Sequence, residues 1–155
     1  MKIIIMRHGE AEYSAPSDAE RALTEKGRAV SCEIAGRLAK QQAVASLDKV
    51  LVSPYLRAQQ TWQAIAQCFT TNQVETCDDI SPYGQADDVV EYIAALIEAE
   101  NLQTLLVVSH LPLVGYLVAE MVAGVPAPMF PTSGIVGIEF DPETRQASLL
   151  WSLYP

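Results

Sequence analysis

The sequence predicts an α/β protein with a mainly parallel sheet that is covered by helices on both faces. Apolar runs of strand length alternate along the chain with longer segments whose apolar residues recur at helical spacing. Such an alternation is typical of strands joined by helical crossovers, which place helices on both sides of a sheet. The 155 residues contain no internal repeat, low-complexity tract or linker, so we expect one domain spanning residues 1–155.

Short apolar patterns specify the individual elements. A β-branched apolar run at Lys2–Met6 predicts a buried strand. Thr24 is placed as an N-cap, because Val30, Ile34 and Leu38 then lie on one helical face. The remaining predicted elements are a strand at Val50–Ser53, a helix after Pro54 with Trp62, Ile65, Ala66 and Phe69 on its core face, a strand at Gln73–Thr76, a helix at Ala86–Glu100, a strand at Leu105–Ser109, a helix at Leu113–Val122, and closing strands at Ile135–Phe140 and Ala147–Leu153.

The net charge limits which classes of partner the protein can bind, and the cysteines indicate the redox state of its compartment. The formal net charge of −9 opposes nucleic acid and anionic lipid, so neither is expected as a partner. The cysteines are odd in number and form no CxxC pair, which favours free thiols in a reducing, cytoplasmic setting. The first apolar run stops at Arg7, too early for a signal peptide. Polar residues interrupt the apolar segment 104–125, which favours a buried strand and helix over a membrane span.

Four basic side chains follow predicted strands. Arg7 and His8 come directly after the first strand, Arg57 lies just beyond the second, and His110 follows the run Leu105–Ser109. Ligands of open parallel sheets bind outside the carboxyl ends of the strands, so we expect these side chains to meet there.

Two arginines and two histidines together are suited to phosphoryl transfer. An arginine fork binds two phosphate oxygens and stays charged, while a neutral His8 could attack phosphorus and form a covalent phosphohistidine. A protonated His110 would donate to the transferring oxygens. Gly9 allows a tight turn and the close approach of a phosphate. No carboxylate or cysteine stands at ligand spacing from either histidine, so no metal site is expected.

These residues resemble the histidine phosphatase superfamily, whose members share the phosphoglycerate mutase-like fold. An Arg-His-Gly triplet after the first strand, a Ser-Pro-x-x-Arg motif from Ser53 to Arg57 and a late Ser-His pair are typical of it. The wider pattern is similar to the SixA-type phosphohistidine phosphatases, the short members of that superfamily. Its segments, in order, are RHGEAE at 7–12, Arg21-x-Leu23-Thr24-x-x-Gly27, VLVSPYLRAQQT at 50–61, SHLPLVGYLVAE at 109–120 and PMFPTSGI at 128–135.

The resemblance implies a three-layer α/β/α sandwich and a phosphate pocket that uses neither a cofactor nor a metal. His8 would be the nucleophile that becomes phosphorylated, and Arg7, Arg57 and His110 would complete the pocket. The substrate class would be phosphohistidine on a protein, such as a histidine phosphotransfer domain of a bacterial signalling relay. Water would then release inorganic phosphate from His8.

The sequence also departs from the larger members of the superfamily. Ser14 stands where those members often carry asparagine, and no general-acid glutamate is recognisable before the second histidine. Asp79 is the candidate general acid in that region. The short segment 82–84 leaves little room for a lid, which favours a phosphoprotein over a sugar phosphate.

Several further polar residues have two interpretations. Ser14, Gly9 and Arg21 are candidate substrate-binding residues, although Arg21 could instead pair with Asp18 or Glu25. The other expectations concern ordinary structural roles: strand-end serines that bond the backbone (Ser53, Ser109), solvated carboxylates (Glu10, Glu12) and a core tryptophan (Trp62).

Two other functions stay open at this stage. A phosphatase or mutase of small phosphorylated metabolites would need a general acid and lid residues. A non-catalytic phosphoprotein-binding module would not need an intact nucleophile. No exposed apolar seam is recognisable in the sequence, so a monomer is expected.

Overall fold

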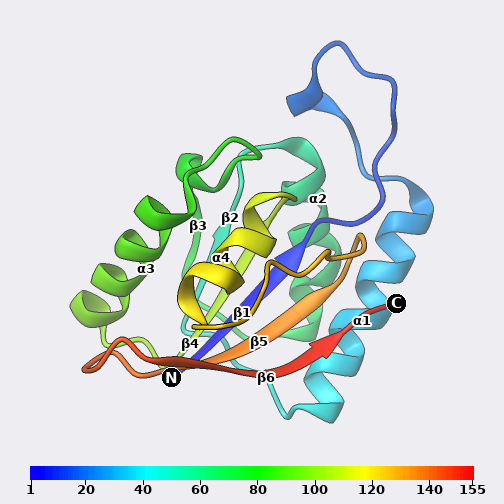
Figure 1. Ribbon diagram of the computed structural model, residues 1–155. Helices are drawn as coiled ribbons and strands as arrows, with labels where there is room; N and C mark the ends of the chain where they lie inside the picture. Colours follow the sequence, from blue (N-terminus) through cyan, green and yellow to red (C-terminus); the bar gives the residue numbers. More distant parts are fainter.

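The computed structural model describes residues 1–155, which form a six-stranded sheet with two helices on each face (Figure 1). The strands are β1 (Lys2–Arg7), β2 (Lys49–Val52), β3 (Val74–Thr76), β4 (Thr104–Ser109), β5 (Ile135–Phe140) and β6 (Ala147–Leu153), and the helices are α1 (Glu25–Gln41), α2 (Leu56–Ile65), α3 (Ala86–Glu100) and α4 (Leu113–Met121). The order across the sheet is β3-β2-β4-β1-β5-β6. The first four strands in that order run parallel, whereas β5 is antiparallel to both of its neighbours. The predicted α/β fold with a mainly parallel sheet is confirmed.

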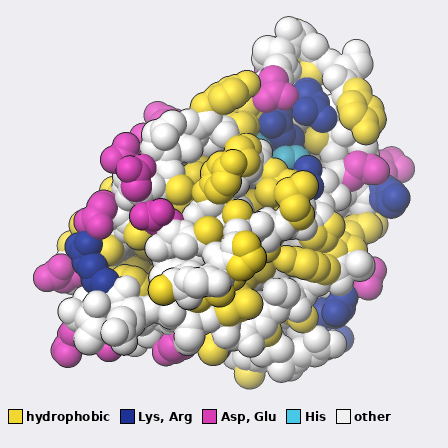
Figure 2. Space-filling model, viewed as in Figure 1, with side chains coloured by type: hydrophobic (Ala, Val, Ile, Leu, Met, Phe, Trp, Pro, Cys, Tyr) yellow, Lys and Arg dark blue, Asp and Glu magenta, His cyan; other side chains and the backbone are white.

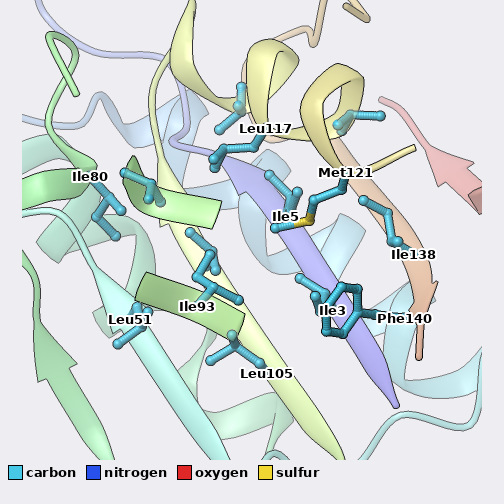
Figure 3. Packing of buried hydrophobic residues seen from close by; sticks show 14 of the residues in the cluster. Ile3, Ile5, Leu51, Ile80, Ile93, Leu105, Leu117, Met121, Ile138 and Phe140 are labelled. Atoms are coloured by element: carbon cyan, nitrogen blue, oxygen red, sulfur yellow. The ribbon is translucent and has the colours of Figure 1, made fainter. Parts of the chain in front are cut away.

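The side chains of β1 alternate between two hydrophobic layers. Ile3 and Ile5 are fully buried beneath α3 and α4, and Ile4 and Met6 are fully buried beneath α1 and α2. Figure 3 shows the first layer, in which side chains of α4 lie over β1. Burying one such aliphatic side chain contributes about 1.5–3 kcal/mol, so the alternation fixes the register of the central strand.

The first helix begins as its sequence predicts. The Thr24 hydroxyl accepts a hydrogen bond from the backbone N–H of Gly27 at 2.9 Å, which satisfies one of the free donors at the start of α1. Ile34 and Leu38 are fully buried on its inner face, whereas Val30 is only partly buried. The N-cap therefore sets where α1 starts and which of its faces packs on the sheet.

The second helix is shorter than its apolar pattern predicts. It ends at Ile65, a 3₁₀ turn follows at Ala66–Cys68, and Phe69 has extended backbone. Two backbone hydrogen bonds of Thr70, to Ala45 and from Leu47, hold the chain beside the segment that leads into β2. The helix cannot continue because this pairing turns the chain toward β3. Trp62 is 8 % exposed, so its predicted place in the core is confirmed.

None of the helices combines the length and the apolar composition that a membrane crossing requires. The apolar segment at 104–125 instead forms β4 and α4, whose side chains fill the core next to β1.

Candidate active site

Three neighbouring strands end at the candidate site. β1 leads into His8, β2 leads into Ser53, and β4 leads into His110, and these strands lie in the order β2-β4-β1. Because Arg7 pairs with Ser109 in the parallel register, the residues that follow them lie side by side. The rings of His8 and His110 are 5.0 Å apart between centroids. The sheet therefore places the two histidines of the chain together at its carboxyl edge.

His8 is held in one tautomer by its two ring contacts. Its Nδ1 lies 2.7 Å from the carbonyl oxygen of Gly9, which can only accept, so Nδ1 carries the proton. Nε2 then keeps its lone pair and accepts a hydrogen bond from Arg57 Nε at 3.3 Å. Burial lowers the pKa of His8 to about 3, and the positive charges of Arg57 and Arg7 add to this effect. The side chain is thus a neutral base, and the lone pair of its Nε2 accepts a single hydrogen bond, from Arg57.

Arg57 is oriented by a carboxylate on the opposite side from His8. Its two terminal nitrogens donate to Asp18, Nη1 to the backbone oxygen at 2.7 Å and Nη2 to Oδ2 at 3.2 Å. The Nε edge of the guanidinium is left to face His8. The guanidinium also lies 5.1 Å from the ring centre of Tyr55. Asp18 and Tyr55 together fix the plane of an arginine that is itself only 4 % exposed.

The second arginine comes from the end of β1 itself. Arg7 donates from Nη1 to the backbone oxygen of Phe130 at 2.8 Å, while its buried Nε has no partner within the protein. Burial and the nearby charge of Arg57 lower the pKa of Arg7, but an arginine keeps its charge at neutral pH. Arg7 therefore has donor capacity to spare at the site.

His110 is anchored by the serine that follows the neighbouring strand. Its Nε2 lies 2.7 Å from Ser53 Oγ, and its Nδ1 is buried without a partner. Burial lowers the pKa of His110 to about 2, with further contributions from His8, Arg57 and Arg7. The ring is therefore neutral in the free protein, whereas the sequence-based mechanism assumed a protonated one. A neutral ring can still donate its one N–H.

Arg7, His8 and Arg57 line an open hollow of about 280 Å³ at the carboxyl edge of the sheet, whereas His110 is buried behind His8 and is not among the lining residues. In Figure 2, histidine and arginine side chains gather at one place on the face that is shown. The lining residues are Arg7, His8, Glu10, Ala11, Tyr13, Arg21, Arg57, Leu111 and Thr132. Three arginines and one carboxylate leave the wall with a positive balance, which suits a phosphoryl group.

The candidate substrate-binding residues have different places. Arg21 lines the hollow, and it also pairs with Asp18 Oδ1 at 3.1 Å. Gly9 lies behind the site, because a Cβ there would be 2.7 Å from both the Gly27 oxygen and Ser31 Oγ. The close packing of α1, and not the approach of a ligand, is what requires glycine at this position. Ser14 is exposed and is not among the lining residues.

Asp79, the candidate general acid, lies outside the hollow. It lines a separate depression of about 480 Å³ together with Asp78, Ser81 and Asp88, and that depression shares no residue with the arginine-lined hollow. The carboxylate in the lining is that of Glu10, whose Oε2 accepts a hydrogen bond from Thr24 Oγ1 at 2.8 Å. Glu10 was expected to be solvated, whereas the structure gives it a bonded place at the rim.

Two residues near the site make contacts that the sequence did not predict. Ser53 and Ser109 both bond the backbone as expected, at the Tyr55 N–H and the Ile80 oxygen, but the Ser53 hydroxyl also contacts His110, which was not expected. Asp18 was considered only as a partner of Arg21, yet it binds Arg57 as well. The Ser-Pro-x-x-Arg motif contains the signal for Ser53. No local pattern connects Asp18 to Arg57, because that contact depends on the path of the loop before α1.

Comparison with known proteins gives the class to which this fold and site belong. The sequence model of the histidine phosphatase superfamily (branch 1) matches residues 3–81. The chain belongs to this superfamily.

Within the superfamily, the chain is similar to the phosphohistidine phosphatase SixA of Escherichia coli. The two are 40% identical over 156 residues, which cover 100% of this chain and 94% of the relative. The SixA homolog of Haemophilus influenzae is 44% identical over 128 residues, covering 78% of this chain and 77% of its own. The structure of the protein histidine phosphatase SixA in complex with tungstate has a TM-score of 0.93 and 41% identity, and the match covers 100% of this chain and 97% of that one.

Proposed function

We propose that this protein is a phosphohistidine phosphatase that removes phosphoryl groups from histidine residues of other proteins. The observation that carries the proposal is the neutral His8, whose Nε2 lone pair faces the Arg57 Nε at 3.3 Å inside an arginine-lined hollow. The whole-chain similarity to relatives that are named phosphohistidine phosphatases supports this choice of substrate.

In the proposed reaction, His8 is the nucleophile. Its Nε2 leaves the hydrogen bond with Arg57 and forms a bond to phosphorus while the P–N bond to the substrate imidazole breaks, and the leaving nitrogen takes up a proton from solvent in the open hollow. Water then attacks phosphorus, the bond to His8 breaks, and inorganic phosphate leaves. The hydrogen bond from Nδ1 to the Gly9 oxygen stabilises the positive charge that develops on the ring during the first step.

The neighbouring groups bind the transferring oxygens. Arg7 and Arg57 supply donors. The unpartnered Nδ1 of His110 supplies a further donor in the tautomer in which the Ser53 hydroxyl donates to Nε2 and the ring proton is on Nδ1. Because the transition state spreads charge over the oxygens, fixed donors at a buried site are effective. The leaving imidazole is readily protonated, so the reaction does not depend on a carboxylic acid such as Asp79.

The proposed partner is a phosphohistidine-bearing protein, for example a histidine phosphotransfer domain of a bacterial signalling relay. The openness of the hollow, with Tyr13 96 % exposed at its wall, admits a side chain carried on another protein. We place the reaction in the cytoplasm and propose that the chain acts as a monomer and a single domain.

The test is phosphate release from a histidine phosphotransfer domain phosphorylated on histidine, measured beside a panel of sugar phosphates. We expect release from the phosphoprotein, at least about a thousandfold loss in His8→Ala, and no loss in the control Ser14→Ala. A radiolabelled phosphoryl group trapped on His8 would identify the intermediate directly. Preferential turnover of sugar phosphates, or an active His8→Ala protein, would contradict the proposal.

A further inference from the structure

A second depression adjoins the active-site hollow. It has a volume of about 670 Å³ and lies between the segment Pro82–Asp87 and the outer face of α4. Pro112, which caps α4, and Tyr116 and Glu120 on the helix follow one another at i, i+4 and i+8, so they form a single stripe along this depression. Leu111 lines the active-site hollow and the next residue, Pro112, lines the depression. We call the depression the α3–α4 groove.

The walls of the α3–α4 groove combine exposed aromatic rings with carboxylates. Tyr83 is 76 % exposed and Tyr116 is 54 % exposed, and both stand on the groove. Asp87 and Glu120 lie at its rim, and neither takes part in an ion pair. Figure 2 shows carboxylate side chains gathered over the part of the surface that α3 occupies in Figure 1, apart from the histidine, with a basic side chain among them.

The acidic surface continues on the other side of Tyr83. The depression lined by Asp78, Asp79 and Asp88 shares Tyr83, Gly84 and Gln85 with the α3–α4 groove. A cationic hollow for the phosphoryl group is therefore bordered by an anionic, aromatic surface. This combination of charges cannot serve the phosphoryl group alone, because carboxylates repel it.

On the basis of the proposed function, we propose that the α3–α4 groove binds a basic segment that flanks the phosphohistidine of the partner protein. His8 is only 7 % exposed, so a phosphohistidine can reach it only if the partner backbone lies against the surface around the hollow. Exposed tyrosines give contact area at low entropic cost, and the unpaired carboxylates complement lysine or arginine side chains. The net charge of −9 also disfavours an acidic segment at long range, so it acts in the same direction as the carboxylates of the groove.

The probes are two synthetic peptides that each carry one phosphohistidine, flanked by lysines in one peptide and by glutamates in the other. We expect the wild-type protein to favour the lysine-flanked peptide about tenfold in kcat/KM at low ionic strength. Glu120→Lys should remove most of this preference, and Tyr116→Ala should lower kcat/KM for the lysine-flanked peptide several-fold. Both variants should hydrolyse phosphoramidate, which is too small to reach the groove, at the wild-type rate. The matched control is Glu143→Lys, which makes the same charge change in the exposed turn between β5 and β6.

The outcomes distinguish docking in the groove from the proposed phosphatase function on which it rests. Loss of the preference in Glu120→Lys but not in Glu143→Lys, with phosphoramidate turnover unchanged, supports docking in the groove. Equal turnover of the two peptides, a preference that survives Glu120→Lys, or an equal loss in Glu143→Lys would overturn the groove while leaving the phosphatase function intact. If the wild-type protein hydrolyses phosphoramidate but neither peptide, the proposed function itself is wrong.

Discussion

At the scale of single residues, the protonation of His8 connects the geometry with the proposed chemistry. The Gly9 carbonyl fixes the proton on Nδ1, and burial beside Arg57 and Arg7 removes the tendency of Nε2 to take up a second one. A nucleophilic histidine must be neutral to attack phosphorus. Burial chiefly keeps the attacking nitrogen unprotonated, and the same arginines that would bind the phosphoryl group add to this effect.

The first prediction concerns the charge of the two histidines between pH 7.5 and pH 5. Because the pKa of His8 is lowered to about 3 and that of His110 to about 2, both rings should stay neutral across this range. Nitrogen and carbon chemical shifts of the imidazoles in a labelled sample would report this directly, with His110→Gln used to assign the two rings. A titration midpoint near the ordinary value of about 6.5 for His8 would contradict the buried, arginine-flanked site.

The second prediction concerns Asp18 as a positioning residue. Its carboxylate holds the tip of Arg57 and turns the Nε edge toward His8, so Asp18→Ala should lower kcat for phosphoramidate about tenfold by loosening the guanidinium. Burial opposes ionisation of Asp18, but the hydrogen bonds from Arg21 and Arg57 outweigh this and lower its pKa, so the contact persists at neutral pH.

Two variants make the Asp18 prediction specific. Asp18→Asn keeps an oxygen acceptor and should lie between Asp18→Ala and the wild type. Glu20→Ala removes a carboxylate from the same turn whose hydrogen-bond partner is Ser17, and it should leave kcat unchanged. Faster turnover in Asp18→Ala would show that the carboxylate competes with the substrate for Arg57 and does not position that arginine.

At the scale of elements, the position of His8 at the carboxyl edge of the sheet depends on how closely α1 approaches the segment after β1. A Cβ at Gly27 would collide with the backbone of Glu10, and one at Gly9 would be 2.7 Å from the Gly27 oxygen. This tight contact holds the backbone of His8–Glu10 against the first turn of the helix. Gly36 lies in the same helix, and a Cβ there would meet no atom within 4 Å.

The third prediction uses this pair of glycines. Gly27→Ala should lower the free energy of unfolding by about 2 kcal/mol, because backbone atoms cannot move aside as a side chain could, and it should also reduce phosphatase activity. Gly36→Ala should instead raise the free energy of unfolding by up to about 1 kcal/mol, since alanine is the better helix former. Urea denaturation of both variants at neutral pH would test this. Equal effects of the two substitutions would disprove the proposed contact.

The elements were largely predictable because their signals are local. The apolar runs of β1 and β4 and the Thr24 N-cap depend only on neighbouring residues, and the structure reproduces them. The end of α2 was not predictable, since the apolar pattern continues to Phe69 while the pairing of Thr70 with Ala45 turns the chain.

In the candidate site, too, the features set by neighbouring residues were predictable, and the contacts between residues far apart in the sequence were not. The positions of Arg7, His8, Arg57 and His110 after strands were visible in the sequence, but the contact of Asp18 with Arg57 joins residues 39 apart. The reason for Gly9 was also hidden, because it lies in the packing against α1. Contacts across loops therefore had to come from the structure.

At the scale of the whole molecule, the two neutral histidines make the stability depend on pH, and this is the fourth prediction. The unfolded chain protonates each histidine near pH 6.5, whereas the folded chain does so only near pH 3 for His8 and pH 2 for His110. The unfolded state therefore binds up to two more protons as the pH falls below 6.5, so stability is highest above that value and decreases toward the lower ones. Between pH 7.5 and pH 5 the free energy of unfolding should fall by on the order of 4 kcal/mol from this cause, about 2 kcal/mol for each histidine. Urea denaturation at both pH values, for the wild type and for a His8→Asn/His110→Gln protein, isolates the effect because the carboxylates are the same in both. The variant should lose most of this pH dependence, and an equal decrease in the two proteins would show that the histidines are not its source.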